Sequence, residues 1–117
     1  MVGRTVCALS LVLVLGVATP HADGRSDAKA QVEFGIEVAQ RGLWNEAIYR
    51  WQRAIDLDPT YAPAWNNLGI AFEHEGKFDE ARRAYETALD LDPTNLFIEQ
   101  NYDLFLEVND RVSQDSR

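Results

Sequence analysis

Most of this sequence is a tandem repeat, in which one segment occurs twice in succession. When residues 28–61 are aligned with residues 62–95 without a gap, 13 of the 34 pairs are identical, where average protein composition would give about two. Large apolar residues also match in kind, as Trp51 does with Tyr85. A repeat of this length is one supersecondary unit, which buries its apolar face only by stacking on a neighbouring copy. The chain is therefore expected to fold as a stack of copies around a continuous core.

Each copy has the pattern of two amphipathic helices. In the second copy Trp65, Leu68, Gly69 and Phe72 recur at the spacing of one helical face. A second apolar stripe follows Gly76 and contains Phe78, Ala81, Tyr85, Ala88 and Leu89. Because helices joined by loops of about two to four residues must pack antiparallel, each copy is predicted to be a helical hairpin.

The ends and the middle of these helices carry further signals. Each copy closes with Asp-Pro-Thr, whose proline cannot continue a helix. The aspartates of this motif, Asp58 and Asp92, are expected to cap the helix that follows. Gly35 and Gly69 lie inside predicted helices, where each costs about 1 kcal/mol relative to alanine. That cost is tolerable where a neighbouring helix approaches too closely to admit a methyl group.

The pattern resembles the tetratricopeptide repeat family. The second copy carries the family positions at Trp65, Leu68, Gly69, Phe72, Ala81, Tyr85, Ala88 and Pro93. The first copy carries Phe34, Gly35, Ala47, Trp51, Ala54 and Pro59, with Gln31 and Val38 in place of two aromatic residues. The resemblance implies an all-α, right-handed α-α superhelix of two helix-turn-helix repeats, 28–61 and 62–95. Their first helices are expected to line a concave groove.

Residues 96–112 continue the period as a first helix with no second helix after it, which is expected to cap the stack. Their apolar residues span about 200° of arc, twice the roughly 100° that a cap requires. The surplus face is either buried within the chain, or a homo-oligomer or partner interface, or exposed without a function. The candidate interface residues are Phe97, Ile98, Phe105 and Val108. Residues 113–117 are expected to be a disordered tail.

The N-terminal segment has a different character from the repeats. Residues 1–22 combine a single charge, Arg4, with an apolar run over residues 6–18, the pattern of a secretory signal peptide. Cleavage is expected after Ala18 or Ala22, followed by a flexible start over residues 23–27. An uncleaved membrane anchor and a buried helix are the alternatives, although a membrane-spanning helix needs about 20 apolar residues.

Removal of this segment defines the compartment that we expect for the mature protein. Cleavage removes Arg4 and Cys7, so the mature chain has a charge of −9 in place of −8 and no cysteine. A disulfide-free exported protein suits a bacterial periplasm or secretion to the cell surface. A membrane-anchored location facing the periplasm follows if the signal is not cleaved.

The sequence lacks the motifs of a catalytic or metal site. His21 and His74 lie far apart, and no phosphate-binding glycine loop or nucleophile motif occurs. We therefore expect no enzymatic activity, no metal, no cofactor and no small-molecule substrate. Because nucleic acids are bound through basic residues, an acidic chain with a pI near 4.6 is not expected to bind them.

Binding of a protein is the function that remains. By resemblance, the groove is lined by Val32, Glu33, Ile36, Gln40, Asn66, Asn67, Ile70 and His74, with Asn101 and Leu104 from the last helix. Amides and aliphatic side chains in combination suit a peptide. The sequence thus favours an exported, non-enzymatic adaptor or scaffold that binds a peptide segment or partner subunit. A structural homo-oligomer and a membrane-tethered protein are the alternatives.

Overall fold

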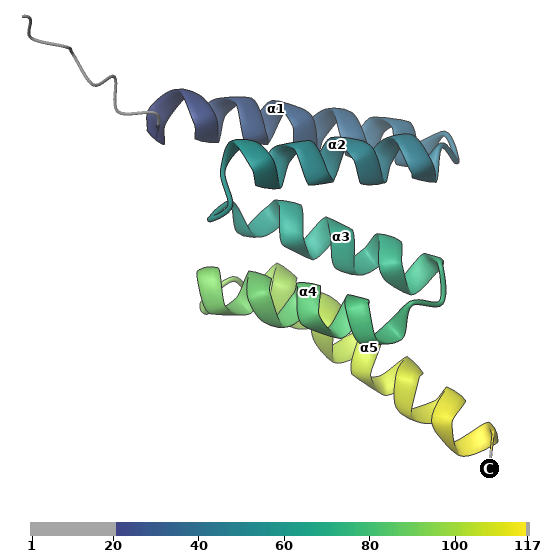
Figure 1. Cartoon of the computed structure of the whole chain (residues 1–117). Helices are drawn as coiled ribbons and strands as arrows, with labels where there is room; N and C mark the ends of the chain where they lie inside the picture. Colours follow the sequence, from purple (N-terminus) through teal and green to yellow (C-terminus); the bar gives the residue numbers. More distant parts are fainter. Residues whose placement is uncertain (1–20, 117) are drawn as a thin grey trace, which may run out of the picture.

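The computed structural model describes residues 21–116, which form five α-helices (Figure 1). These are α1 (His21–Gln40), α2 (Trp44–Leu57), α3 (Ala62–His74), α4 (Phe78–Leu91) and α5 (Leu96–Asp115). The helices follow one another across the molecule in chain order, and each reverses the direction of the one before it. This part of the chain contains no strand. The predicted all-α stack of two helix pairs and a closing helix is confirmed.

The two helix pairs turn in the same way. Gly42 and Gly76 have φ values of +80° and +74°, which a glycine adopts without steric cost. In the first pair, the N–H of Leu43 donates to Val38 O at 3.0 Å and that of Gly42 to Ala39 O at 2.9 Å. The second pair repeats both bonds at the equivalent positions. This double bond is the Schellman motif, which ends the first helix and sets the entry of the second.

The glycines inside α1 and α3 admit the aromatic side chains of the helices packed against them. A Cβ built on Gly35 would lie 2.4 Å from Trp51 Nε1, and one on Gly69 would lie 2.9 Å from Tyr85 Cε1. Both distances are too short for real atoms. The expectation that a close helix approach explains these glycines is confirmed.

The closing helix α5 completes the core of the second repeat. Ile98 packs on Ala62 and Ala88, and the ring of Phe105 lies 5.5 Å from that of Tyr85. Both Ile98 and Phe105 are only 1% exposed. The helix therefore covers the side of α3 and α4 that a further repeat would cover.

The beginning of α1 differs from the prediction. Residues 23–27, predicted to be flexible, are helical. Arg25 fixes this segment, because its Nε donates to Asp58 Oδ2 at 3.0 Å and its guanidinium also donates to Thr60 Oγ1 at 3.1 Å. A Cβ on Gly24 would lie 2.8 Å from the carbonyl oxygen of Leu57. The start of α1 thus packs directly against the end of α2.

The aspartates of the Asp-Pro-Thr motif shape the turns and do not cap the following helices. Asp58 accepts hydrogen bonds from the backbone N–H and hydroxyl of Thr60 at 3.0 and 2.6 Å. The Thr60 hydroxyl bond, helped by Arg25, lowers the pKa of Asp58 against the opposing effect of burial. At α5 the cap is Asn95, whose side chain accepts from two backbone N–H groups and donates to Asp92 at 2.9 Å.

The predicted boundaries of the C-terminal tail and of the signal peptide can be compared with the described residues. Helix α5 continues to Asp115. The prediction of a disordered tail over residues 113–117 is therefore wrong for residues 113–115. Residues 1–20, which hold most of the predicted signal peptide, lie outside the described residues. Within residues 21–116, no helix combines the length and the apolar character needed to cross a membrane.

Candidate functional site

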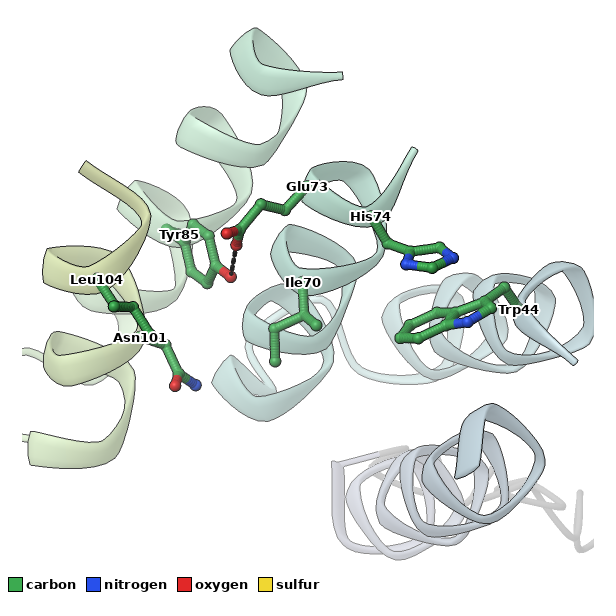
Figure 2. Close-up of a pocket in the computed structure, with 7 residues that line it drawn as sticks. All are labelled: Trp44, Ile70, Glu73, His74, Tyr85, Asn101 and Leu104. Carbon is green, nitrogen blue, oxygen red and sulfur yellow. Dashed lines mark hydrogen bonds between the residues drawn. The ribbon is translucent and has the colours of Figure 1, made fainter. Parts of the chain in front are cut away.

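Two adjoining hollows are lined by residues of the five helices. The polar hollow has a volume of about 400 Å³ and is lined by Trp44, Ile70, Glu73, His74, Tyr85, Asn101 and Leu104 (Figure 2). The apolar hollow has a volume of about 370 Å³ and is lined by Ile36, Ala39, Gln40, Trp44, Trp51, Asn67, Ile70 and Phe97. Because Trp44 and Ile70 line both hollows, the two form one surface, which we call the groove.

A row of aliphatic residues runs along the groove from helix to helix. Ile36, Ile70 and Leu104 are separated by one repeat period each, so each has the same position on α1, α3 or α5. Ile36 is 41% exposed and Leu104 is 60% exposed, while Ile70 between them is half-buried. The repeat therefore supplies one apolar side chain to the groove from each of α1, α3 and α5.

Trp44 forms the boundary between the hollows. It is the first residue of α2, and its indole stacks on the imidazole of His74, the last residue of α3, with ring centres 4.1 Å apart (Figure 2). In the second repeat the matching residue, Phe78, packs on Phe105 of α5 instead, at 6.5 Å. One position of the repeat thus serves the groove in the first copy and the cap in the second.

Glu73 and Tyr85 supply the ionisable groups on the other side of the polar hollow. The Tyr85 hydroxyl donates to Glu73 Oε2 at 2.9 Å, as the dashed line in Figure 2 marks. Burial, followed by this bond, strongly raises the pKa of Tyr85, so the phenol stays neutral and remains a donor. None of the ion pairs formed in the described part of the chain includes Glu73.

Three asparagines link α3 to α5 beneath the groove. The Asn101 amide donates to Asn66 Oδ1 at 3.1 Å, and the Asn66 amide donates to Asn67 Oδ1 at 3.3 Å. Asn66 is 1% exposed, and its amide is satisfied within this chain of bonds. Buried, fully bonded amides fix the relative position of the elements that they join. Asn66 therefore orients α5, while Asn67 and Asn101 reach the hollows.

The structure places the ten predicted groove residues in three settings. Seven line the two hollows: Ile36, Gln40, Asn67, Ile70, His74, Asn101 and Leu104. Val32 and Asn66 do not, because they point into the packed interior and are 4% and 1% exposed. Glu33 is exposed outside both hollows. The prediction is therefore wrong for Val32 and Asn66 as contact residues.

The predicted oligomer face of the last helix also divides into two sets. Ile98 and Phe105 belong to the core, so their assignment to a surface interface is wrong. Phe97 and Val108 are 65% and 39% exposed. They form an exposed stripe along α5, the outer stripe, with the members Phe97, Leu104, Val108 and Val112.

Several residues of the groove were missed from the sequence. Trp44, Glu73 and Tyr85 line the polar hollow, and Trp51 lines the apolar one. The repeat pattern identifies the aromatic residues as core positions, and three of these four are indeed large repeat positions. That pattern gives no signal that an edge of the same ring can reach the groove.

The side chains of the groove are suited to binding. Within the described range there is no group of three or more histidine, cysteine, aspartate or glutamate side chains placed to hold a metal ion. The groove offers aliphatic and aromatic surface, three side-chain amides, one imidazole and one carboxylate. Such a mixture of apolar pockets and convergent polar groups is typical of peptide-recognition surfaces.

Comparison with known families agrees with the helical stack. Residues 62–95 match the model described as "Tetratricopeptide repeat", and residues 37–76 match the model described as "TPR repeat". A comparison with curated proteins found no match.

Among solved structures the chain is similar to two of MamA. The first has 29% sequence identity and a TM-score of 0.64, covering 73% of this chain and 50% of that one. The second has 30% identity and a TM-score of 0.62, covering 73% of this chain and 46% of that one. This chain therefore spans about half the length of the MamA chains that it matches.

Proposed function

From its membership of the tetratricopeptide repeat family, we propose that this chain is a non-enzymatic adaptor or scaffold that holds a peptide segment or partner subunit in its groove. The fold supports a protein–protein interaction module. The observation that supports the groove as the binding surface is its continuity, because Trp44 and Ile70 line both hollows and the two together extend over residues of all five helices. A peptide backbone is bound by amides while its side chains enter apolar pockets.

Substitution of a shared wall residue tests this proposal. Ile70→Ser removes apolar surface from both hollows, whereas Tyr49→Ser removes an exposed apolar residue, 52% exposed, that lines neither of them. A partner captured from the native host and identified by mass spectrometry should be lost with Ile70→Ser and kept with Tyr49→Ser. Helix content measured by circular dichroism controls for folding. Equal capture by folded Ile70→Ser would contradict binding in the groove.

A structural homo-oligomer is the second candidate, and the outer stripe of α5 favours it. Exposed apolar stripes of this kind mark interaction surfaces. The charge of α5 opposes self-pairing, because five acidic residues accompany only Arg111 along the helix, and like charges repel across an interface. Sedimentation of wild type and of Val108→Ser/Val112→Ser separates the candidates, because these two exposed residues of the outer stripe line neither hollow. A larger mass that this double substitution reduces to the monomer would establish the oligomer.

We also propose export, with cleavage after Ala18. The support comes from the apolar run over residues 6–18 and from Gly16 and Ala18, the small residues that precede this cut. Mass spectrometry of the protein from periplasmic and membrane fractions tests this. A mature chain that begins at Thr19 in the periplasm is expected, and Met1 retained in the membrane fraction would establish a tethered form.

A further inference from the structure

The groove contains an acidic side chain but no lysine or arginine. The residues that line its two hollows include one carboxylate, Glu73, and one imidazole, His74, but neither lysine nor arginine. The chain as a whole has 19 acidic and 11 basic side chains. A ligand that enters the groove therefore meets negative charge both at the contact surface and at longer range.

The Glu73 carboxylate is placed to bind a cationic group. It is half-buried, and the Tyr85 hydroxyl is its only side-chain donor among residues 24–116. Oε2 accepts that bond, so Oε1 is left with no protein donor in this range. A carboxylate partly removed from water gains most from a charged donor, because the interaction strengthens as the local dielectric falls. The neutral phenol holds the carboxylate in place without neutralising it.

The apolar hollow adjoins this carboxylate. Ile70 lines both hollows, and the apolar hollow also has Ile36, Trp51 and Phe97 in its walls. Phe97 is 65% exposed at the start of α5, so an entering side chain would cover it. A ligand that filled both hollows would thus carry an apolar group next to a cationic one.

A second copy of this chain does not have the charge for this role. Each copy has a formal charge of −8, so two copies repel one another as they approach. A basic segment of a different protein has the complementary charge.

We propose that the groove recognises a segment in which lysine or arginine lies beside a side chain of the size of leucine, isoleucine or phenylalanine. Glu73 Oε1 accepts from the basic group, and the apolar side chain enters the hollow lined by Ile36, Trp51 and Phe97. This inference rests on the proposed function and names the chemistry of its ligand.

Selection from a displayed library of random 12-residue peptides tests the ligand class. The bait is the purified protein expressed from its full sequence, either wild type or Ile70→Ser. Wild type should enrich peptides with lysine or arginine within four residues of a large apolar residue, and Ile70→Ser should not enrich them. If wild type enriches no peptide that depends on Ile70, the proposed function itself fails. If it enriches Ile70-dependent peptides without a basic residue, only the present inference fails.

A double-mutant cycle then assigns the basic residue to Glu73. Glu73→Gln keeps an oxygen for the Tyr85 hydroxyl and removes the charge. Glu75→Gln is the matched control, because Glu75 is two residues away and already pairs with Lys77 at 2.8 Å. Fluorescence anisotropy of an enriched peptide should show binding about tenfold weaker with Glu73→Gln and nearly unchanged with Glu75→Gln.

Replacement of the basic peptide residue by glutamine completes the cycle. This peptide should bind wild type about tenfold more weakly, and Glu73→Gln should then cause no further loss. Equal losses with Glu73→Gln and Glu75→Gln would show only a general effect of charge and overturn the assignment. Independent, additive losses from the protein and peptide substitutions would overturn it too.

Discussion

The two repeats share a backbone but differ in where their central aromatic residue directs its polar atom. Trp51 of the first repeat donates from Nε1 to the Val32 carbonyl oxygen at 3.3 Å, inside the core. Tyr85 of the second repeat donates to the Glu73 carboxylate at the groove. Each ring packs over the glycine of its own repeat. Both rings therefore stabilise the fold and also line the groove, but only Tyr85 directs its polar atom to a group at the groove.

The repeats also differ in the contacts that stabilise the end of the stack at which each repeat lies. Arg25 bonds the start of α1 to Asp58 and Thr60, in the turn that ends the first repeat, whereas large side chains of α5 cover the second repeat. The first repeat is thus secured by a polar bond near one end and the second by apolar burial along a helix. Substitutions at three places, the cap, the helix glycines and the Asp58 turn, test how the two repeats differ.

The largest effect is expected where α5 covers the second repeat. Phe105→Ala leaves a cavity beside Tyr85 and should lower the free energy of unfolding by about 3–5 kcal/mol, measured by urea denaturation. Hydrogen exchange should show protection lost first in α3 and α4. Leu104→Ala is the control on the same helix, because its side chain is 60% exposed and little burial is lost. If Phe105→Ala lowers the free energy of unfolding no more than Leu104→Ala does, the assignment of α5 as the cap is contradicted.

A smaller and unequal effect is expected at the two helix glycines. An added methyl group meets Trp51 at 2.4 Å in Gly35→Ala but meets Tyr85 at 2.9 Å in Gly69→Ala. Overpacking should therefore cost about 2 kcal/mol at Gly35 and about 1 kcal/mol at Gly69, after the gain in helix propensity. Urea denaturation of both variants gives the comparison directly. If Gly69→Ala is the more destabilised variant, the tighter contact does not lie in the first repeat.

The smallest effect is expected at the Arg25–Asp58 ion pair, which holds the start of α1 against the end of the first repeat. Asp58→Asn should cost about 1 kcal/mol at neutral pH, and Asp92→Asn should cost less because Asp92 has no arginine partner among the described ion pairs. The pKa of Asp58 is lowered in the folded chain relative to its unfolded value of about 3.9. Its contribution is therefore present above about pH 4 and is lost as the pH falls through the folded pKa.

Thermal melts between pH 2 and pH 7 measure this dependence. The difference in melting temperature between wild type and Asp58→Asn should shrink below about pH 4. A difference that stays constant with pH would show that the carboxylate charge contributes nothing.

The helices and their turns could be predicted because each is encoded locally and repeated. The spacing of apolar residues, the glycines at 42 and 76 and the Asp-Pro pairs recur in both copies at equivalent positions, so two copies support one interpretation. The start of α1 could not be predicted in this way. Arg25 pairs with Asp58, 33 residues away, and nothing in the second repeat corresponds to that contact.

The site was harder to predict than the fold because the repeat fixes positions but not the direction of each side chain. The broad apolar arc of α5 was evident from the sequence, yet the period does not say which half of it turns inward. Ile98 and Phe105 are buried, while Phe97 and Leu104 are exposed. Trp44 and Phe78 likewise share a position, and only the different neighbours in space assign one to the groove and the other to the cap.

The row formed by Ile36, Ile70 and Leu104 also determines how a protein of this kind can change in size. Each first helix supplies one member of the row, and the members are spaced by the repeat period. Duplication of residues 62–95 in the gene would insert one more aliphatic contact and one more pair of helices. The length of ligand that such a surface can accommodate therefore changes in steps of one whole repeat, and shorter insertions would interrupt the row.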